Sequence, residues 1–110
     1  MNIPKNQRSA LAQLRCGILP LRVETGRFRN EPLTDRLCVF CNLNEIENEI
    51  HFILKCTLYN DLRNLLIRNT TGSTNYEEFE LFRTLVCTYP RQCSQFIINA
   101  LKLRQSKFSR

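Results

Sequence analysis

The sequence predicts a small all-α domain of four or five helices with a Cys-Cys-His-Cys knuckle. Its 110 residues are close to the commonest size for one domain, so we expect residues 1–110 to form a single unit. Apolar residues recur at helical spacing in several segments that proline, glycine or polar residues separate. A cluster of metal-ligating residue types lies between the first of these segments and the others.

The first helix is expected over residues 4–16, where Ala10, Leu11 and Leu14 form an apolar stripe and Gly17 offers a stop. Residues 18–23 are apolar around a central proline and fit either a short helix or a packed extended link. Residues 26–30 are basic around one phenylalanine, which either packs inward or stacks on a nucleobase. Residues 31–37 are expected to be a loop.

The candidate metal ligands follow this loop and are Cys38, Cys41, His51 and Cys56. Two thiols separated by two residues can both face inward from a tight turn, and the next nine residues are enough to return with the other two ligands. Zinc prefers sulfur and imidazole ligands, and four protein ligands leave no open position for water or substrate. The pattern therefore predicts one structural zinc ion. The alternative is a metal-free core of ordinary buried cysteines and a core histidine.

The spacing of the last two ligands restricts the local fold. In a continuous α-helix the side chains of His51 and Cys56 would point about 140° apart, away from any shared ion. We therefore expect the helix that holds His51 to end near Lys55.

Three carboxylates, Glu45, Glu47 and Glu49, precede that histidine. A helix that begins near Ile46 would place Glu47 and Glu49 in its first turn, where the helix dipole favours negative charge. A catalytic role is disfavoured because no second carboxylate cluster is present and the only histidine belongs to the metal site.

The second half predicts three more helices. Thr57 is expected to cap a helix that runs to about Asn69 and buries Leu58, Leu62, Leu65 and Leu66. After a loop at residues 69–74, a C-terminal helical hairpin is expected over about residues 75–108. Its first helix opens with an Asn75-to-Glu78 capping box and buries Phe79, Phe82, Leu85 and Val86. Tyr89-Pro90 separates it from a last helix that buries Cys93, Phe96, Ile97, Ala100 and Leu101.

The net charge of +6 is concentrated at the two ends of the chain. Residues 1–37 carry seven Lys or Arg against three acids, and residues 90–110 carry five against none. Clustered cations neutralise phosphates and release counterions, so this distribution favours a polyanionic partner. The alternative is a solvated basic surface that maintains solubility.

The compartment is expected to be reducing, and so intracellular, either nuclear or cytoplasmic. Residues 1–8 are polar and basic and do not resemble a secretory signal, and no apolar run is long enough to span a membrane. We therefore interpret Cys16, Cys87 and Cys93 as small core residues rather than as a disulfide framework. Neither a glycine-rich phosphate loop nor the zinc deaminase pattern is present, so no enzymatic activity is expected.

The short sequence motifs around the candidate ligands resemble those of the reverse transcriptase zinc-binding domain. That domain lies at the C-terminal end of polyproteins of non-LTR (LINE-like) retrotransposons. The resemblance covers about residues 8–66. The segments that carry the resemblance are Leu14-Arg15-Cys16-Gly17, Leu19-Pro20-Leu21-Arg22, Thr25-Gly26-Arg27-Phe28, Asp35-Arg36-Leu37-Cys38-Val39-Phe40-Cys41, Glu49-Ile50-His51-Phe52 and Cys56.

The resemblance implies the same four zinc ligands and a role in holding RNA or DNA beside a reverse transcriptase polypeptide, without catalysis of its own. The basic residues expected to contact phosphates are Arg15, Arg22, Arg27, Arg29 and Arg36, joined by Lys102, Arg104 and Lys107. The alternative function is a zinc-stabilised protein-interaction module that docks on a polymerase or another partner through an exposed apolar patch.

Overall fold

The computed structural model describes residues 5–17, 19, 21, 30–73 and 75–108, and within these ranges every helix or strand element is a helix. The elements are α1 (Lys5–Cys16), η1 (Leu33–Asp35), η2 (His51–Lys55), η3 (Thr57–Tyr59), α3 (Asn60–Arg68), α4 (Glu78–Thr88) and α5 (Pro90–Phe108). The predicted all-α class is confirmed. Much of the segment between α1 and η1, including residues 18, 20 and 22–29, lies outside the described residues, and so do the expectations for it.

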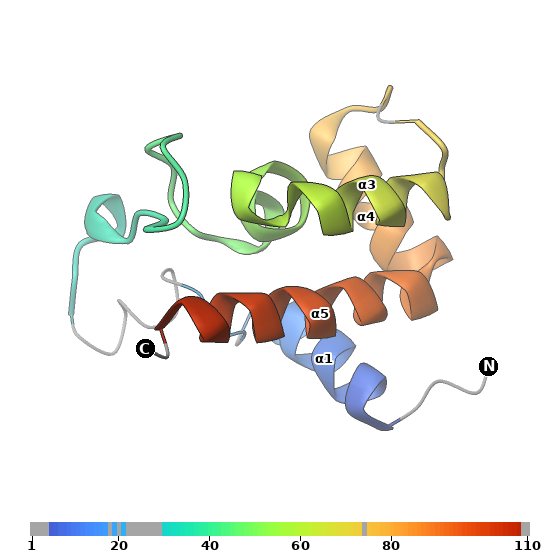
Figure 1. Ribbon diagram of the computed structural model, residues 1–110, viewed down its shortest axis with the longest axis horizontal. Coiled ribbons are helices and arrows are strands. Elements are labelled where there is room, and N and C mark those ends of the chain that lie inside the picture. The colour runs from blue at the N-terminus through green and yellow to red at the C-terminus, as the bar shows by residue number, and fades with distance from the viewer. Residues whose placement is uncertain (1–4, 18, 20, 22–29, 74, 109–110) are drawn as a thin grey trace.

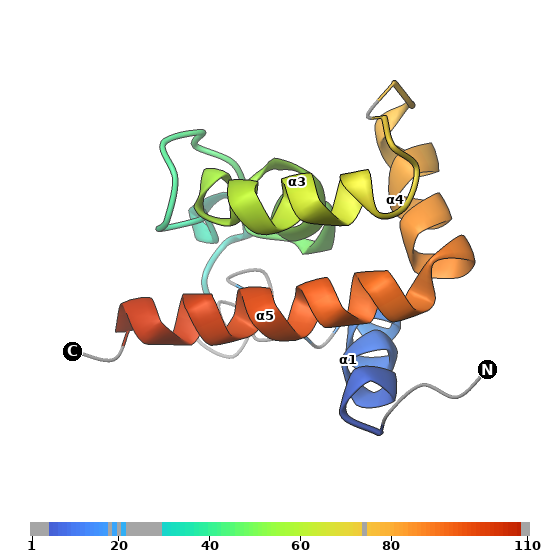
Figure 2. The ribbon, with the colours of Figure 1, turned by 45° about the vertical axis from the view of Figure 1, so that its right-hand side comes forward.

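Helix α5 is the longest described helix and the one on which the others assemble. Helices α1, α3 and α4 each pack against it, and Figures 1 and 2 show α1 and α3 on different sides of it. The predicted buried stripe of α5 is buried at Cys93, Phe96, Ile97 and Ala100 and half-buried at Leu101. The predicted break at Tyr89-Pro90 is confirmed, since α4 ends at Thr88 and α5 begins at Pro90.

Three aromatic rings join the ligand-bearing segment to this core. The Phe52 ring of η2 lies edge-on to Tyr59 and to Phe96 of α5, with centroid separations of 5.0 and 6.0 Å. Phe52 and Tyr59 are fully buried. Edge-to-face pairs at these separations add to the free energy of burying the rings, so they stabilise the packing of the segment around His51 on the core.

Two helices begin at other residues than the local sequence patterns predicted. Thr57 was expected to cap one helix, but the chain forms the 3-10 turn η3 and then α3. Asn75 was expected to open α4, but Glu77 is the cap, and its carboxylate accepts hydrogen bonds from the amides of Phe79 and Glu80, both at 3.2 Å. Glu77 stands directly before the first helical residue, where a carboxylate can reach the free amides.

Two apolar side chains predicted to be buried are exposed. Leu65 is 50% and Phe79 66% exposed, because the buried stripe of α3 runs through Arg63, Leu66 and Ile67 and that of α4 through Leu81, Leu85 and Val86. Leu65 lies on the opposite side of α3 from its stripe, and Phe79 lies in the first turn at the edge of its stripe.

The interpretation of three cysteines as core residues holds for one of them. Cys93 is buried, whereas Cys16 and Cys87 lie on the exposed sides of α1 and α4, and all three thiols are free. Among the described residues, no helix has both the length and the apolar character that crossing a bilayer requires.

Candidate metal centre

A short hairpin carries the first two candidate ligands. Leu37 and Ile46 form an isolated antiparallel bridge, and the amide of Cys38 donates to the Glu45 carbonyl at 2.9 Å. Asn44 has a φ of +58°, a left-handed conformation that asparagine tolerates better than most residues. The hairpin therefore presents Cys38 and Cys41 from its turn, as the spacing predicted.

The four candidate ligands converge on one point. Their ligand atoms all lie within 4.8 Å of one another, with Cys38 Sγ and Cys56 Sγ 3.7 Å apart and Cys41 Sγ 3.4 Å from His51 Nε2. A tetrahedral zinc ion with usual bond lengths would place two sulfurs about 3.8 Å apart and a sulfur and a nitrogen about 3.5 Å apart. The two closest separations match these values, and the cluster as a whole is compatible with one metal ion.

A π turn brings the side chains of His51 and Cys56 to the same side, although their spacing would make them point apart in an α-helix. The amide of Cys56 donates to the His51 carbonyl at 2.8 Å, so the turn η2 closes over five residues instead of four. This wider turn returns the chain nearly above His51, whereas an α-helix would place Cys56 about 140° away. Cys56 then leaves in an extended conformation, which confirms that the helical segment ends at Lys55.

The start of this segment differs from the prediction. Helical residues begin at Glu49 instead of near Ile46, because Ile46 is held in the hairpin bridge. The Asn48 side-chain oxygen accepts a hydrogen bond from the His51 amide at 2.9 Å and so caps the turn. Glu49 lies in the first turn as expected, but Glu47 does not.

Glu45 orients the histidine ligand. Its Oε1 lies 3.0 Å from His51 Nδ1, which leaves Nε2 directed at the cysteines. This is the carboxylate–histidine pairing that commonly fixes the tautomer of a metal ligand. The hydrogen bond to His51 lowers the pKa of Glu45, and Lys55 contributes from 3.5 Å on the other carboxylate oxygen. Lys55 also lies 3.3 Å from Glu78, which links the site to the start of α4.

Arg63 holds the backbone before and at Cys56, the last candidate ligand. This buried side chain donates from Nε to the Ile53 carbonyl at 2.8 Å and from Nη2 to the Cys56 carbonyl at 2.7 Å. The end of a helical turn leaves carbonyls without partners, and a guanidinium can satisfy several of them at once. Burial lowers the pKa of Arg63 from its usual value.

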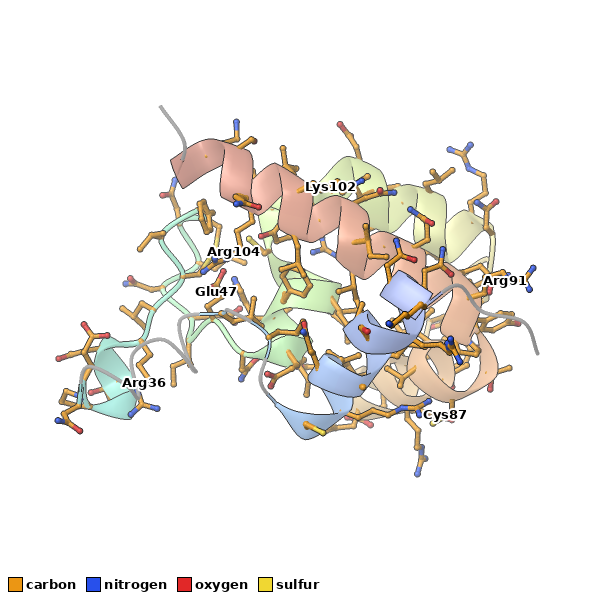
Figure 3. The ribbon with its side chains drawn as sticks, turned by 90° about the horizontal axis from the view of Figure 1, so that it is seen from below. Arg36, Glu47, Cys87, Arg91, Lys102 and Arg104 are labelled. Atoms are coloured by element: carbon orange, nitrogen blue, oxygen red, sulfur yellow. The ribbon has the colours of Figure 1, made fainter. Side chains whose placement is uncertain are left out.

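A buried ion pair joins the knuckle to the end of α5. Arg104 donates from Nε and Nη2 to the two carboxylate oxygens of Glu47 at 3.1 and 2.8 Å, and Figure 3 shows the two side chains facing each other. Glu47 is 0% and Arg104 7% exposed, and the guanidinium lies 5.2 Å from the centre of the Phe40 ring. Arg104 therefore has a structural role and is not on the surface where a phosphate contact was predicted. Glu47 is likewise an interior partner and not a helix-start charge.

Hydrogen bonding between the cysteines of the site changes the pKa of their thiols. The hydrogen bond that the Cys38 thiol donates to Cys56 Sγ, together with burial, raises the pKa of Cys38 to about 12. The amide of Phe40 points at the same sulfur from 3.5 Å. Because a metal binds the thiolate, its binding would release this proton.

The other predicted phosphate contacts that the structure describes lie on α1, on α5 and in the loop before the knuckle. Arg15 on α1, and Lys102 and Lys107 on α5, are exposed. Arg36 is half-buried and donates to the Glu31 carbonyl from Nε and Nη2 at 3.1 and 2.8 Å, which helps to order the loop before the knuckle. Arg22, Arg27 and Arg29 lie outside the described residues.

The sequence patterns found the four residues that converge here but missed the residues that support them. Glu45 and Arg63 act through contacts with His51 and Cys56 that no short motif encodes. Comparisons with models of known protein families, with curated proteins and with solved structures find no match to this chain. The resemblance to the reverse transcriptase zinc-binding domain therefore stays a prediction.

Proposed function

We propose that this chain is a structural-zinc module that binds RNA or DNA and has no catalytic activity of its own. Zinc is the metal that a set of three sulfurs and one imidazole nitrogen suits best, and here all four residues except the half-buried Cys41 are buried. With four protein ligands its shell is complete, so the ion would stabilise the fold rather than activate water. The role suggested by the resemblance, holding template RNA or target DNA for a reverse transcriptase, fits this kind of module.

The observation that carries the proposal is the pairing of two helices without acidic residues. Neither α1 nor α5 contains an Asp or Glu, while together they carry seven Lys and Arg. They lie far apart in sequence, yet the fold packs them together, with Gln7 Nε2 donating to Gln95 Oε1 at 2.7 Å. Apart from Arg104, which pairs with Glu47, these cations are exposed. An exposed basic surface of this kind attracts phosphates and releases their counterions.

A salt titration tests the proposal. We expect zinc-loaded protein to bind fluorescently labelled single-stranded RNA or DNA at low salt, with affinity that falls steeply as salt rises. Neutralising Arg8 on α1 (Arg8→Gln) should weaken binding to unrelated sequences alike and reduce the salt slope by about one unit if that residue contacts a phosphate. Arg68→Gln on α3 is the matched control, since it removes the same exposed charge from a helix outside the proposed surface. Folded, zinc-loaded protein that binds neither nucleic acid at low salt would refute the proposal.

One observation favours a second function, a protein-interaction module. Val39 and Leu43 project from the knuckle turn with 62% and 45% of their surfaces exposed. Exposed apolar side chains on a rigid turn can dock into a partner protein. Binding of a polymerase polypeptide that resists salt and is lost in Val39→Ser and Leu43→Ser would favour this function over nucleic-acid binding.

A further inference from the structure

A groove runs along the junction of α1 and α5. The groove is shallow and widely open to solvent, with a volume of about 590 Å³. It is lined from α5 by Ile98 and Leu101 and from α1 by Lys5, Asn6, Ser9, Ala10 and Gln13. The groove therefore lies between the two helices that have no acidic residues.

The chemistry of the lining is divided between the two helices. The α1 side offers two amides and a hydroxyl, which can both donate and accept hydrogen bonds, and one ammonium group. The α5 side offers aliphatic surface from Ile98 and Leu101. A ligand that fits has a flat apolar face, a polar edge and a negative charge nearby. An unpaired nucleotide has all three, because its base combines a stacking face with hydrogen-bonding edges and its backbone carries a phosphate.

Cations are placed to meet that backbone. Lys5 lines the groove, and exposed Lys102 follows Leu101 directly. Arg91, Ile98 and Lys102 are spaced by two turns and one turn, so they share one side of α5. Figure 3, which views the molecule from the α1 side, shows Arg91 and Lys102 at opposite ends of the region that α1 crosses.

A second groove, between α3 and α5, lacks this combination. It is smaller, at about 140 Å³, and its lining of Leu62, Leu65, Leu66, Asn69, Gln92, Gln95, Phe96 and Asn99 contains no cation. Asp61 is also exposed on α3. The α3–α5 groove has amides and apolar surface but no complementary charge, which makes it a natural internal control.

We propose that the α1–α5 groove holds an unpaired base of single-stranded nucleic acid. Asn6, Ser9 and Gln13 contact the edge of the base, its face packs on Ile98 and Leu101, and Lys5 and Lys102 contact the adjacent phosphates. This inference rests on the proposed nucleic-acid binding and deepens it, because it makes the module selective for single strands and sensitive to base identity.

The test compares two glutamine variants of the zinc-loaded full chain. Binding of labelled oligo(A), oligo(C), oligo(U) and a duplex is measured by fluorescence anisotropy. We expect wild-type protein to prefer single strands over the duplex and one homopolymer over the others. Gln13→Ala should reduce that homopolymer preference by about tenfold, the usual effect of losing a base-edge contact, and leave the salt slope unchanged because no charge is removed. Gln92→Ala, which makes the same change in the α3–α5 groove, should behave as wild type.

The outcomes separate this inference from the function on which it rests. No binding of any oligonucleotide by wild-type protein refutes nucleic-acid binding itself. Equal binding of duplex and single strands, or a Gln13→Ala protein with the wild-type homopolymer preference, overturns the groove assignment alone. Both glutamines are exposed, so both variants should fold, and matching thermal unfolding curves would verify this.

Discussion

Replacing Arg104 with methionine tests whether the buried ion pair holds the knuckle on the helical core. Arg104→Met keeps much of the aliphatic length of the side chain but removes both hydrogen bonds to Glu47. The carboxylate, which is 0% exposed and lies 4.0 Å from Cys38 Sγ, would then stay buried without the charge and the two hydrogen bonds that Arg104 supplies. Removing one partner of a buried pair typically costs about 3–5 kcal/mol, so we expect a loss of that size in the free energy of unfolding.

The measurement is urea unfolding followed by circular dichroism at a fixed free zinc concentration. Lys102→Met is the matched control, because it removes an exposed cation from the same helix and should change stability by less than about 0.5 kcal/mol. The double variant Glu47→Leu/Arg104→Met should recover most of the loss, since an apolar pair leaves no charge uncompensated. A loss below about 1 kcal/mol in Arg104→Met, or no recovery in the double variant, would refute the reasoning.

Four further changes test the metal centre and the core. Cys41→Ser should lower the melting temperature and abolish the stabilisation by added zinc; an unchanged melting curve would show that no metal is bound there. Glu45→Ala should weaken zinc affinity about tenfold or more, measured by competition with a chelator, because the His51 ring loses its orienting partner. Zinc affinity should rise with pH between about 6 and 9, since the metal must displace the proton that the raised pKa of Cys38 retains, and a flat profile would contradict this. Tyr59→Phe should stabilise the protein by about 1 kcal/mol in thermal unfolding, because no described residue forms a hydrogen bond with the buried Tyr59 hydroxyl; a loss of stability would contradict this.

Short-range patterns in the sequence predicted the candidate ligand set and the helix breaks. Cys38, Cys41, His51 and Cys56 were recognisable because metal coordination constrains spacing along the chain. The end of the helical segment at Lys55 followed from the geometry of an α-helix, and the break at Tyr89-Pro90 followed from the sterics of proline. These features depend on residues close in sequence, so the sequence alone was enough.

Contacts between distant residues were decided only by the tertiary structure. Glu47 and Arg104 are 57 positions apart, and each looked like a surface charge in its own segment. Leu65 and Phe79 fit a helical stripe but are exposed, because periodicity shows which residues share a face and not which face a neighbouring helix covers. The pairing of α1 with α5, and with it the groove between them, depends in the same way on packing across the whole chain, which no local pattern encodes.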